Sequence, residues 1–173
     1  NMNMYRSFMP GAKKYKVKIC LENLFGNYKG RIIEGACTEV SEACAYIDAL
    51  NAEAGEDVFG LCLDIGHATL MRRNLYQYIK ALGPRLTCLH IHDNDGQDDL
   101  HMMPFTYTHT WGKNLVSDWD GFINGLRDIN YQGDLCFETF RVLESFPRDL
   151  WDYAFRLISA TGRYFVKRIE SET

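Results

Sequence analysis

The sequence lacks three features that would each place it in a particular class of protein. No apolar run approaches the roughly 20 residues that a membrane-spanning helix needs. The chain has no basic excess, because 19 Lys and Arg face 23 Asp and Glu for a net charge of −4, and a basic face is the usual footprint of nucleic-acid binding. The first 18 residues contain no apolar core of a signal peptide, and the six cysteines lack the tight spacing of a disulfide framework. We therefore expect a cytoplasmic chain with neither a membrane nor a nucleic acid as partner.

What is present is an ordinary globular composition. The chain has 173 residues, of which 46% are hydrophobic and 24% are charged. This length suits one core of moderate size, so we expect residues 1–173 to form a single domain.

Short apolar runs alternate with longer amphipathic segments along the chain. The apolar runs cover 15–24, 58–67, 86–95 and 133–140, and the amphipathic segments cover 41–55, 74–83, 117–133 and 147–165. We expect Ser41 to cap the first amphipathic helix, Gly55 and Gly83 to end the first two, and Pro147 to lie in the first turn of the last. Strands that alternate with helices predict an α/β fold with a parallel sheet. Residues 26–30 are expected to form a plain connecting loop, and residues 93–114 one long irregular loop of the kind that is usually functional.

A repeated pattern ends each apolar run. A cysteine is followed by a large apolar residue and then by a residue that can bind metal, in Cys20-Leu21-Glu22, Cys62-Leu63-Asp64, Cys88-Leu89-His90 and Cys136-Phe137-Glu138. Side chains alternate between the two faces of a strand, so each cysteine shares a face with its polar neighbour. We expect the four polar residues to meet at one height at the carboxyl ends of the strands, above a layer of the four cysteines. The cysteines are expected to be small apolar packing residues rather than metal ligands.

Three carboxylates and one imidazole would make a site of mostly hard oxygen ligands. Such a set favours one divalent ion, Mn²⁺ first, with Mg²⁺, Co²⁺ or Zn²⁺ as alternatives. Bringing three carboxylates together without a cation would be costly, which favours the metal over a set of separate strand-end caps or salt bridges. His92 shares a face with His90 and is the alternative imidazole ligand.

Four segments carry a resemblance to a known family. "VKICLEN", "LCLDIGH", "LHIHDNDG" and "YQGDLCFETF" resemble, in family order, the xylose-isomerase-like TIM-barrel superfamily, which includes sugar phosphate isomerases and epimerases, ketose 3-epimerases and endonuclease IV. The resemblance implies about four βα units, the C-terminal half of an eight-stranded barrel. It places the metal ligands at Glu22, Asp64, His90 and Glu138, the four residues that the strand pattern also selects.

The resemblance also implies an activity. It predicts a divalent-metal-dependent isomerase or epimerase of a sugar or sugar phosphate, in which Glu22 and Glu138 exchange a proton through a metal-stabilised enediolate. The residues expected to contact the substrate are His67, His92, Asp93 and His101. The sequence leaves open which sugar is used, whether it is phosphorylated, and whether the reaction is isomerisation or epimerisation.

Two other functions stay open at this point. In an endonuclease-IV-like zinc phosphodiesterase, Asp99 and His101 would join His67 in a three-zinc cluster; in the other alternative, the chain is a non-catalytic truncated half-barrel. Because the strands within 15–22 and 134–139 would have open edges, we expect a homo-oligomer or pairing with the other half of a barrel. Tyr107, His109 and Trp111 are expected either to line the pocket or to pack within their loop.

Overall fold

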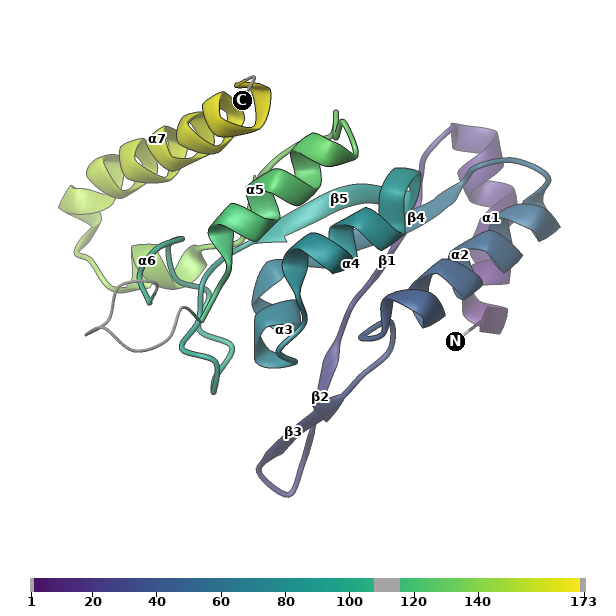
Figure 1. Ribbon diagram of the computed structural model, residues 1–173, viewed down its shortest axis with the longest axis horizontal. Helices are drawn as coiled ribbons and strands as arrows, with labels where there is room; N and C mark the ends of the chain where they lie inside the picture. The colour runs from purple at the N-terminus through teal and green to yellow at the C-terminus, as the bar shows by residue number, and fades with distance from the viewer. Residues whose placement is uncertain (1, 108–115, 172–173) are drawn as a thin grey trace.

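Helices and strands alternate along the computed structural model, which describes residues 2–107 and 116–171 (Figure 1). The helices are α1 (Met2–Tyr15), α2 (Val40–Ala54), α3 (Ile65–Leu70), α4 (Leu75–Leu82), α5 (Trp119–Asp128), α6 (Phe140–Glu144) and α7 (Trp151–Glu170). The strands are β1 (Ile19–Glu22), β2 (Phe25–Tyr28), β3 (Arg31–Glu34), β4 (Phe59–Asp64), β5 (Leu86–Ile91) and β6 (Cys136–Phe137). Two short 3₁₀ helices, η1 (Gly83–Arg85) and η2 (Arg148–Leu150), precede β5 and α7.

Four strands form one parallel sheet in the order β1-β4-β5-β6. The prediction of an α/β fold with a parallel sheet is therefore confirmed, and the architecture is that of a partial TIM barrel. β1 and β6 are the two edge strands of this sheet. All four strands run the same way, so their carboxyl ends meet at one rim.

The core lies between one face of the sheet and the helices. Leu21, Leu63 and Leu89 from β1, β4 and β5 are buried there with Ile79 of α4 and Phe122 of α5. In Figure 1, α2, α4 and α5 cover this face in turn, and α7 lies beside α5. α5 owes its position to an apolar stripe of residues three and four apart, the spacing that turns one side of a helix toward a core.

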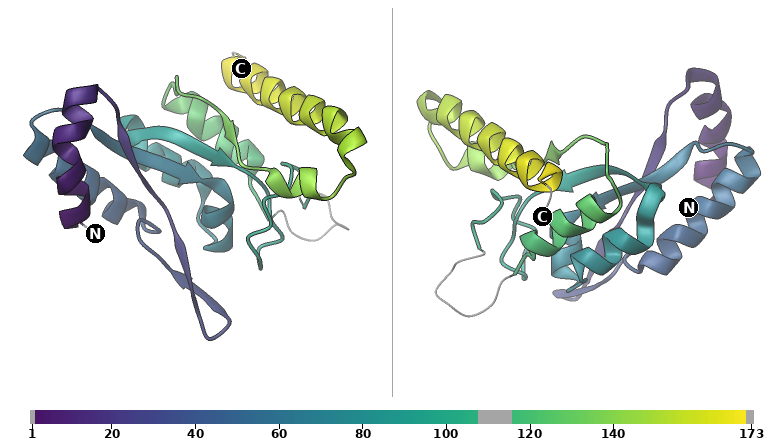
Figure 2. Two further views of the ribbon diagram at one scale, coloured as in Figure 1. Left: turned by 180° about the vertical axis from the view of Figure 1, so that it is seen from behind. Right: turned by 45° about the horizontal axis from the view of Figure 1, so that its top comes forward.

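The four strand cysteines lie on the other face of the sheet. None of Cys20, Cys62, Cys88 and Cys136 belongs to the core cluster, and three of them are half-buried. Seen from behind, this face is open between α1 and α7 within the described part of the chain (Figure 2). The alternation of side chains therefore separates Cys and ligand-type residues from the large apolar residues between them, as predicted.

The strands are staggered rather than level. Asp64 pairs directly with His90, but Glu22 pairs with Cys62 and His90 pairs with Cys136. The four polar residues are therefore offset in hydrogen-bond register, by two residues at β1 and by two at β6. Tilted strands in a barrel-type sheet produce this stagger.

A β-hairpin replaces the loop expected at 26–30. β2 and β3 pair antiparallel, and the hairpin extends away from the sheet beyond β1 (Figure 1). Its two-residue turn places Lys29 and Gly30 at positive φ, 52° and 76°, which is the backbone of a type I′ turn. The tight turn explains why an extended arm forms where a loop was expected.

The helix ends match expectation in part. Gly55 and Gly83 follow α2 and α4 as expected, with Gly55 left-handed at φ 71°. The N-cap of α2 is Glu39 rather than Ser41, and Pro147 caps η2 ahead of α7 rather than lying inside the helix. Within the described residues, no helix is both long and apolar enough to cross a membrane.

Candidate functional site

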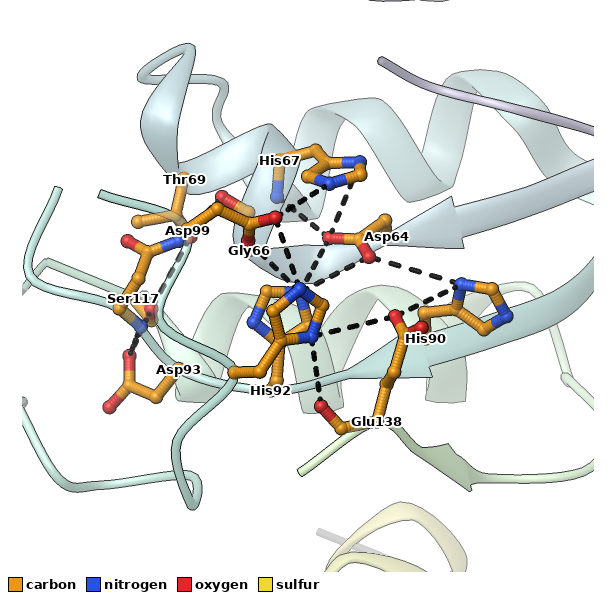
Figure 3. A network of polar contacts seen from close by, with 12 residues as sticks. Asp64, Gly66, His67, Thr69, His90, His92, Asp93, Asp99, Ser117 and Glu138 are labelled. Carbon is orange, nitrogen blue, oxygen red and sulfur yellow. Dashed lines mark hydrogen bonds and ion pairs between the residues drawn. The ribbon is translucent and has the colours of Figure 1, made fainter. Parts of the chain in front are cut away.

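Three carboxylates surround one ring nitrogen at the carboxyl ends of the strands. His90 Nδ1 lies 3.3 Å from Glu22 Oε1. The same nitrogen lies 3.4 Å from Glu138 Oε2 and 3.9 Å from Asp64 Oδ2 (Figure 3). Glu22 ends β1, Asp64 ends β4, His90 lies near the end of β5, and Glu138 follows β6. The structure therefore brings the four predicted ligands together, because their side chains bridge the two-residue stagger of the backbones.

Asp64 is held more firmly than the other carboxylates. It is fully buried, and it caps α3 by accepting a hydrogen bond at Oδ1 from the backbone N–H of His67, 2.7 Å away. The Asn23 side chain makes two hydrogen bonds with the backbone of Asp64. It accepts from Asp64 N at 2.7 Å and donates to Asp64 O at 2.9 Å. These bonds tie the end of β1 to the end of β4 and fix the direction of the Asp64 carboxylate.

His92 is the buried member of the H-x-H pair. Its Nε2 lies 3.0 Å and 3.1 Å from the two oxygens of Asp64, whereas His90 has a side chain that is 33% exposed. A Cβ on Gly66 would come within 1.9 Å of the His92 ring, so this position at the start of α3 admits only glycine. Ligand atoms of Asp64, His92 and Glu138 lie within 4.8 Å of one another, as do those of Glu22, Asp64 and His90.

His67 lies beside the carboxylates and is oriented by the backbone. Its Nδ1 donates to the carbonyl of Asn23 at 2.9 Å, and its Nε2 lies 3.4 Å from Asp99 Oδ2. Burial of the ring lowers the pKa of His67, but the hydrogen bond to Asp99 and the charge of Asp64 outweigh that effect and raise the pKa to about 9. Without a metal, His67 is therefore a cation that offsets part of the negative charge of the site.

Asp99 gathers three imidazoles next to the first cluster. Its carboxylate lies 3.0 Å from His101, 3.4 Å from His67 and 3.7 Å from His92. Burial raises the pKa of Asp99, but the hydrogen bond to His67 and the charges of the rings more than reverse this effect and lower it. The His92 and His101 rings stack at a centroid distance of 4.1 Å. These contacts make a second group of nitrogen and oxygen atoms that could hold a cation.

Asp93 is the one predicted site residue that the structure leaves out of these clusters. Its carboxylate is fully buried and accepts from the Ser117 hydroxyl at 2.6 Å and from the backbone N–H of Tyr107 at 3.0 Å. Both oxygens are used within the loop, which places Asp93 in support of the site rather than on its open side (Figure 3). His109 and Trp111 lie outside the described residues.

The donor set fits a divalent ion. Among the described residues, every ion pair recorded for Glu22, Asp64 and Glu138 is with a histidine, and none is with Lys or Arg. Three converging carboxylates without a fixed cation repel one another, and an oxygen-rich ion would remove that repulsion. Such an arrangement can bind two oxygens of a substrate and place carboxylates beside its C–H bonds.

Asn23 is the functional residue that sequence reasoning missed. It follows the predicted ligand Glu22 directly, yet no spacing rule links it to Asp64, 41 positions later. Gly66 carried a weak signal, since a glycine just after a strand end often marks close approach of another group.

Comparisons with known proteins identify the family of this chain and its fold. The profile of a family described as xylose isomerase-like TIM barrel matches residues 5–160. The chain is also 36% identical over 83 residues to the uncharacterized protein y4fM of Sinorhizobium fredii (strain NBRC 101917 / NGR234), a match that spans 48% of this chain and 24% of that protein.

Solved structures show the same fold. A D-tagatose 3-epimerase-like protein is matched over 93% of this chain and 55% of its own, with a TM-score of 0.58 and 18% identity. 3-Keto-D-glucoside 4-epimerase YcjR from E. coli is matched over 80% of this chain and 44% of its own, with a TM-score of 0.58 and 21% identity. D-allulose 3-epimerase from Methylomonas sp. is matched over 79% of this chain and 39% of its own, with a TM-score of 0.56 and 23% identity. The chain thus spans about half the length of these proteins, or less.

Proposed function

Since the chain belongs to the xylose isomerase-like TIM-barrel family, we propose that it carries the metal-binding half of an isomerase or epimerase that acts on a sugar or sugar phosphate. The observation that carries this proposal is the convergence of Glu22, Asp64 and Glu138 on His90 Nδ1 at 3.3–3.9 Å. The epimerase names of the solved structures with this fold support the substrate class.

We assign one divalent ion to these four side chains, with Mn²⁺ as the first choice. Three of the four ligands are carboxylates, which suit Mn²⁺ and Mg²⁺ better than a thiophilic ion. Asp64 is the central ligand of the proposal because it belongs both to the group with Glu22 and His90 and to the group with His92 and Glu138. The fully buried His92 is the alternative imidazole ligand.

The proposed chemistry is a proton transfer between two glutamates. A bound divalent ion would supply Lewis-acid polarisation of the sugar carbonyl. Glu22 and Glu138 approach His90 from opposite edge strands of the sheet, so one can remove a proton from the carbon next to the carbonyl while the other returns one. His67, whose ring is oriented by Asn23 and Asp99, would bind a sugar oxygen beside them.

Mn²⁺ titration followed by electron paramagnetic resonance tests the metal site. We expect one Mn²⁺ per chain and loss of that binding in Asp64→Asn, because Asp64 belongs to both ligand groups. Comparing His90→Asn with His92→Asn assigns the imidazole. Glu144→Gln is the control, since Glu144 is an exposed carboxylate on α6 that pairs with Arg141. Binding that survives in Asp64→Asn would contradict the assignment.

Deuterium exchange tests the reaction. Incubation of a ketohexose with the Mn²⁺-loaded chain in D₂O should place deuterium on the sugar next to the carbonyl. Glu22→Gln and Glu138→Gln should each abolish the exchange, since an amide cannot accept the proton. Exchange at the wild-type rate in both variants would refute the proposed roles.

A zinc phosphodiesterase of the endonuclease IV type is the second candidate, and the group of His67, His101 and His92 around Asp99 favours it. It requires more than one zinc ion per chain and cleavage of DNA at abasic sites. The net charge of −4 disfavours a DNA substrate. Zinc analysis together with an abasic-site cleavage assay separates the two candidates.

We also propose that the sheet pairs with a further half-barrel, from a second copy or from another part of a longer protein. β1 and β6 each have one neighbour in the described sheet, so their outer edges are free for pairing there. Sedimentation velocity of the chain would show whether copies pair with one another.

A further inference from the structure

The cysteine face of the sheet contains a second group of ligand atoms. Cys62 Sγ, Cys88 Sγ and a ring nitrogen of His90 lie within 4.8 Å of one another. Cys136 Sγ lies 4.0 Å from Cys88 Sγ on the neighbouring strand. Cys62 and Cys88 face each other directly in the parallel pairing of β4 and β5. Two sulfur atoms and one imidazole nitrogen are therefore close enough to bind one ion, and Cys136 lies beside them, next to Cys88.

The spacing suits one tetrahedral ion. Two sulfur atoms bound to Zn²⁺ at about 2.3 Å with tetrahedral angles stand about 3.8 Å apart, and the ligand atoms of Cys62, Cys88 and His90 all lie within 4.8 Å of one another. None of these cysteines belongs to the core cluster between the sheet and the helices, since their side chains lie on the opposite face of the sheet. The Cys88 thiol makes long contacts with Cys136 and with the carbonyl of Leu89, and it also contacts the Cys62 thiol.

We infer that Cys62, Cys88 and His90 form a binding site for a thiophilic divalent ion such as Zn²⁺, one layer below the carboxylate site. Soft thiolates select zinc over manganese, while the carboxylates above have the opposite preference. On binding, each cysteine gives its proton to water and becomes a thiolate ligand. The sequence alone predicts that these cysteines are packing residues, and the structure adds a possible role as metal ligands.

The site shares one residue with the proposed function and is otherwise independent of it. His90 belongs both to this group and to the group with Glu22 and Asp64. A thiophilic ion bound by the cysteines would draw the imidazole away from the carboxylates. The position of the His90 ring would thus differ between a chain that binds a thiophilic ion and a chain that binds an ion such as Mn²⁺.

Co²⁺ and Cd²⁺ are the probes, because thiolate ligation gives an intense charge-transfer band, in the near-ultraviolet for Co²⁺ and at shorter ultraviolet wavelengths for Cd²⁺, that carboxylate ligation does not give. We expect this band in the full chain under reducing conditions and its loss in Cys62→Ser/Cys88→Ser. Cys44→Ser is the matched control, since Cys44 is a half-buried cysteine on α2, remote from the sheet face. Glu138→Gln should keep the band while it loses Mn²⁺ binding, which separates failure of this site from failure of the carboxylate site.

A second measurement needs no variant, in case the double substitution unfolds the chain. Cd²⁺ should slow the alkylation of Cys88 by iodoacetamide, mapped by mass spectrometry, and leave that of Cys44 unaffected. No charge-transfer band in the wild type, or equal alkylation with and without Cd²⁺, would overturn the site.

Discussion

At the scale of single residues, Asn23 does the most to fix the geometry of the site. Its amide bridges the backbone N–H and carbonyl of Asp64, and its own carbonyl accepts from His67 Nδ1. Glu22 and His67 come from different segments of the chain. Asn23 follows Glu22 directly in the sequence and is hydrogen-bonded to the His67 ring. One buried side chain therefore sets the distance between β1 and the start of α3.

Replacing Asn23 by Ala should destabilise the chain by about 2–4 kcal/mol, because two buried backbone groups of Asp64 lose their partners. Urea unfolding followed by circular dichroism measures this loss. Asn124→Ala is the control, since Asn124 is exposed on α5 and should change stability by no more than about 0.5 kcal/mol. An equal effect in the two variants would contradict the role given to Asn23.

His67 should make the stability of the metal-free chain depend on pH. Its folded-state pKa of about 9 lies above the ordinary value of 6.5, so the stabilisation is fully present below pH 6.5 and is lost as the pH rises through 9. The loss should amount to about 2–4 kcal/mol. Unfolding in EDTA at pH 6 and pH 9.5, compared with His67→Gln, gives the measurement. If the stability of the wild type changes with pH no more than that of the variant, the role of His67 is refuted.

At the scale of elements, α4 and α5 touch through a glycine. A Cβ on Gly125 would lie 3.0 Å from Ile79 Cβ, whereas a Cβ on Gly11 of α1 would meet nothing within 4 Å. Gly125→Ala should therefore destabilise the chain by about 1–3 kcal/mol through overpacking. Gly11→Ala should stabilise it by about 0.5–1 kcal/mol, the helix-propensity gain alone. Thermal unfolding of the two variants checks both signs, and a loss in both would indicate that helix packing is not the cause.

How far these elements could be predicted depends on how local their signals are. The strands and helices of the parallel sheet follow from apolar periodicity, and Gly55 and Gly83 end their helices where expected. The β2–β3 hairpin was missed because its strands are short and mostly exposed, although the Lys-Gly turn was a usable signal. The strand stagger could not be predicted, since it depends on pairing between segments far apart in the sequence.

The candidate site was predictable where it repeats a strand pattern and not where it relies on loops. Glu22, Asp64, His90 and Glu138 each follow a cysteine and an apolar residue, so the sheet alone brings them together. The contacts of Asp99 with three imidazoles depend on the path of the segment after β5, which no periodicity describes.

At the scale of the whole molecule, a divalent ion should act as a structural element. Mn²⁺ at 100 times its dissociation constant should stabilise the chain by about 2.7 kcal/mol, because the ion binds the folded state alone. Differential scanning fluorimetry with Mn²⁺ and then EDTA should show a reversible rise in melting temperature that is absent in Glu22→Gln/Glu138→Gln. A rise of the same size in that variant would place the ion elsewhere.

The stagger of the strands also determines how this sheet can close. The ligand-bearing positions shift by two residues between β1 and β4 and again between β5 and β6, with no shift between β4 and β5. The metal-binding side chains thus follow half a winding of a shallow spiral, which rises four residues in register over these four strands. A closed (β/α)₈ barrel has a shear number of about 8, so a second set of four strands with the same rise would bring the spiral back into register. Any partner that completes this sheet must therefore continue the same register offset between neighbouring strands, as well as supply the missing strands.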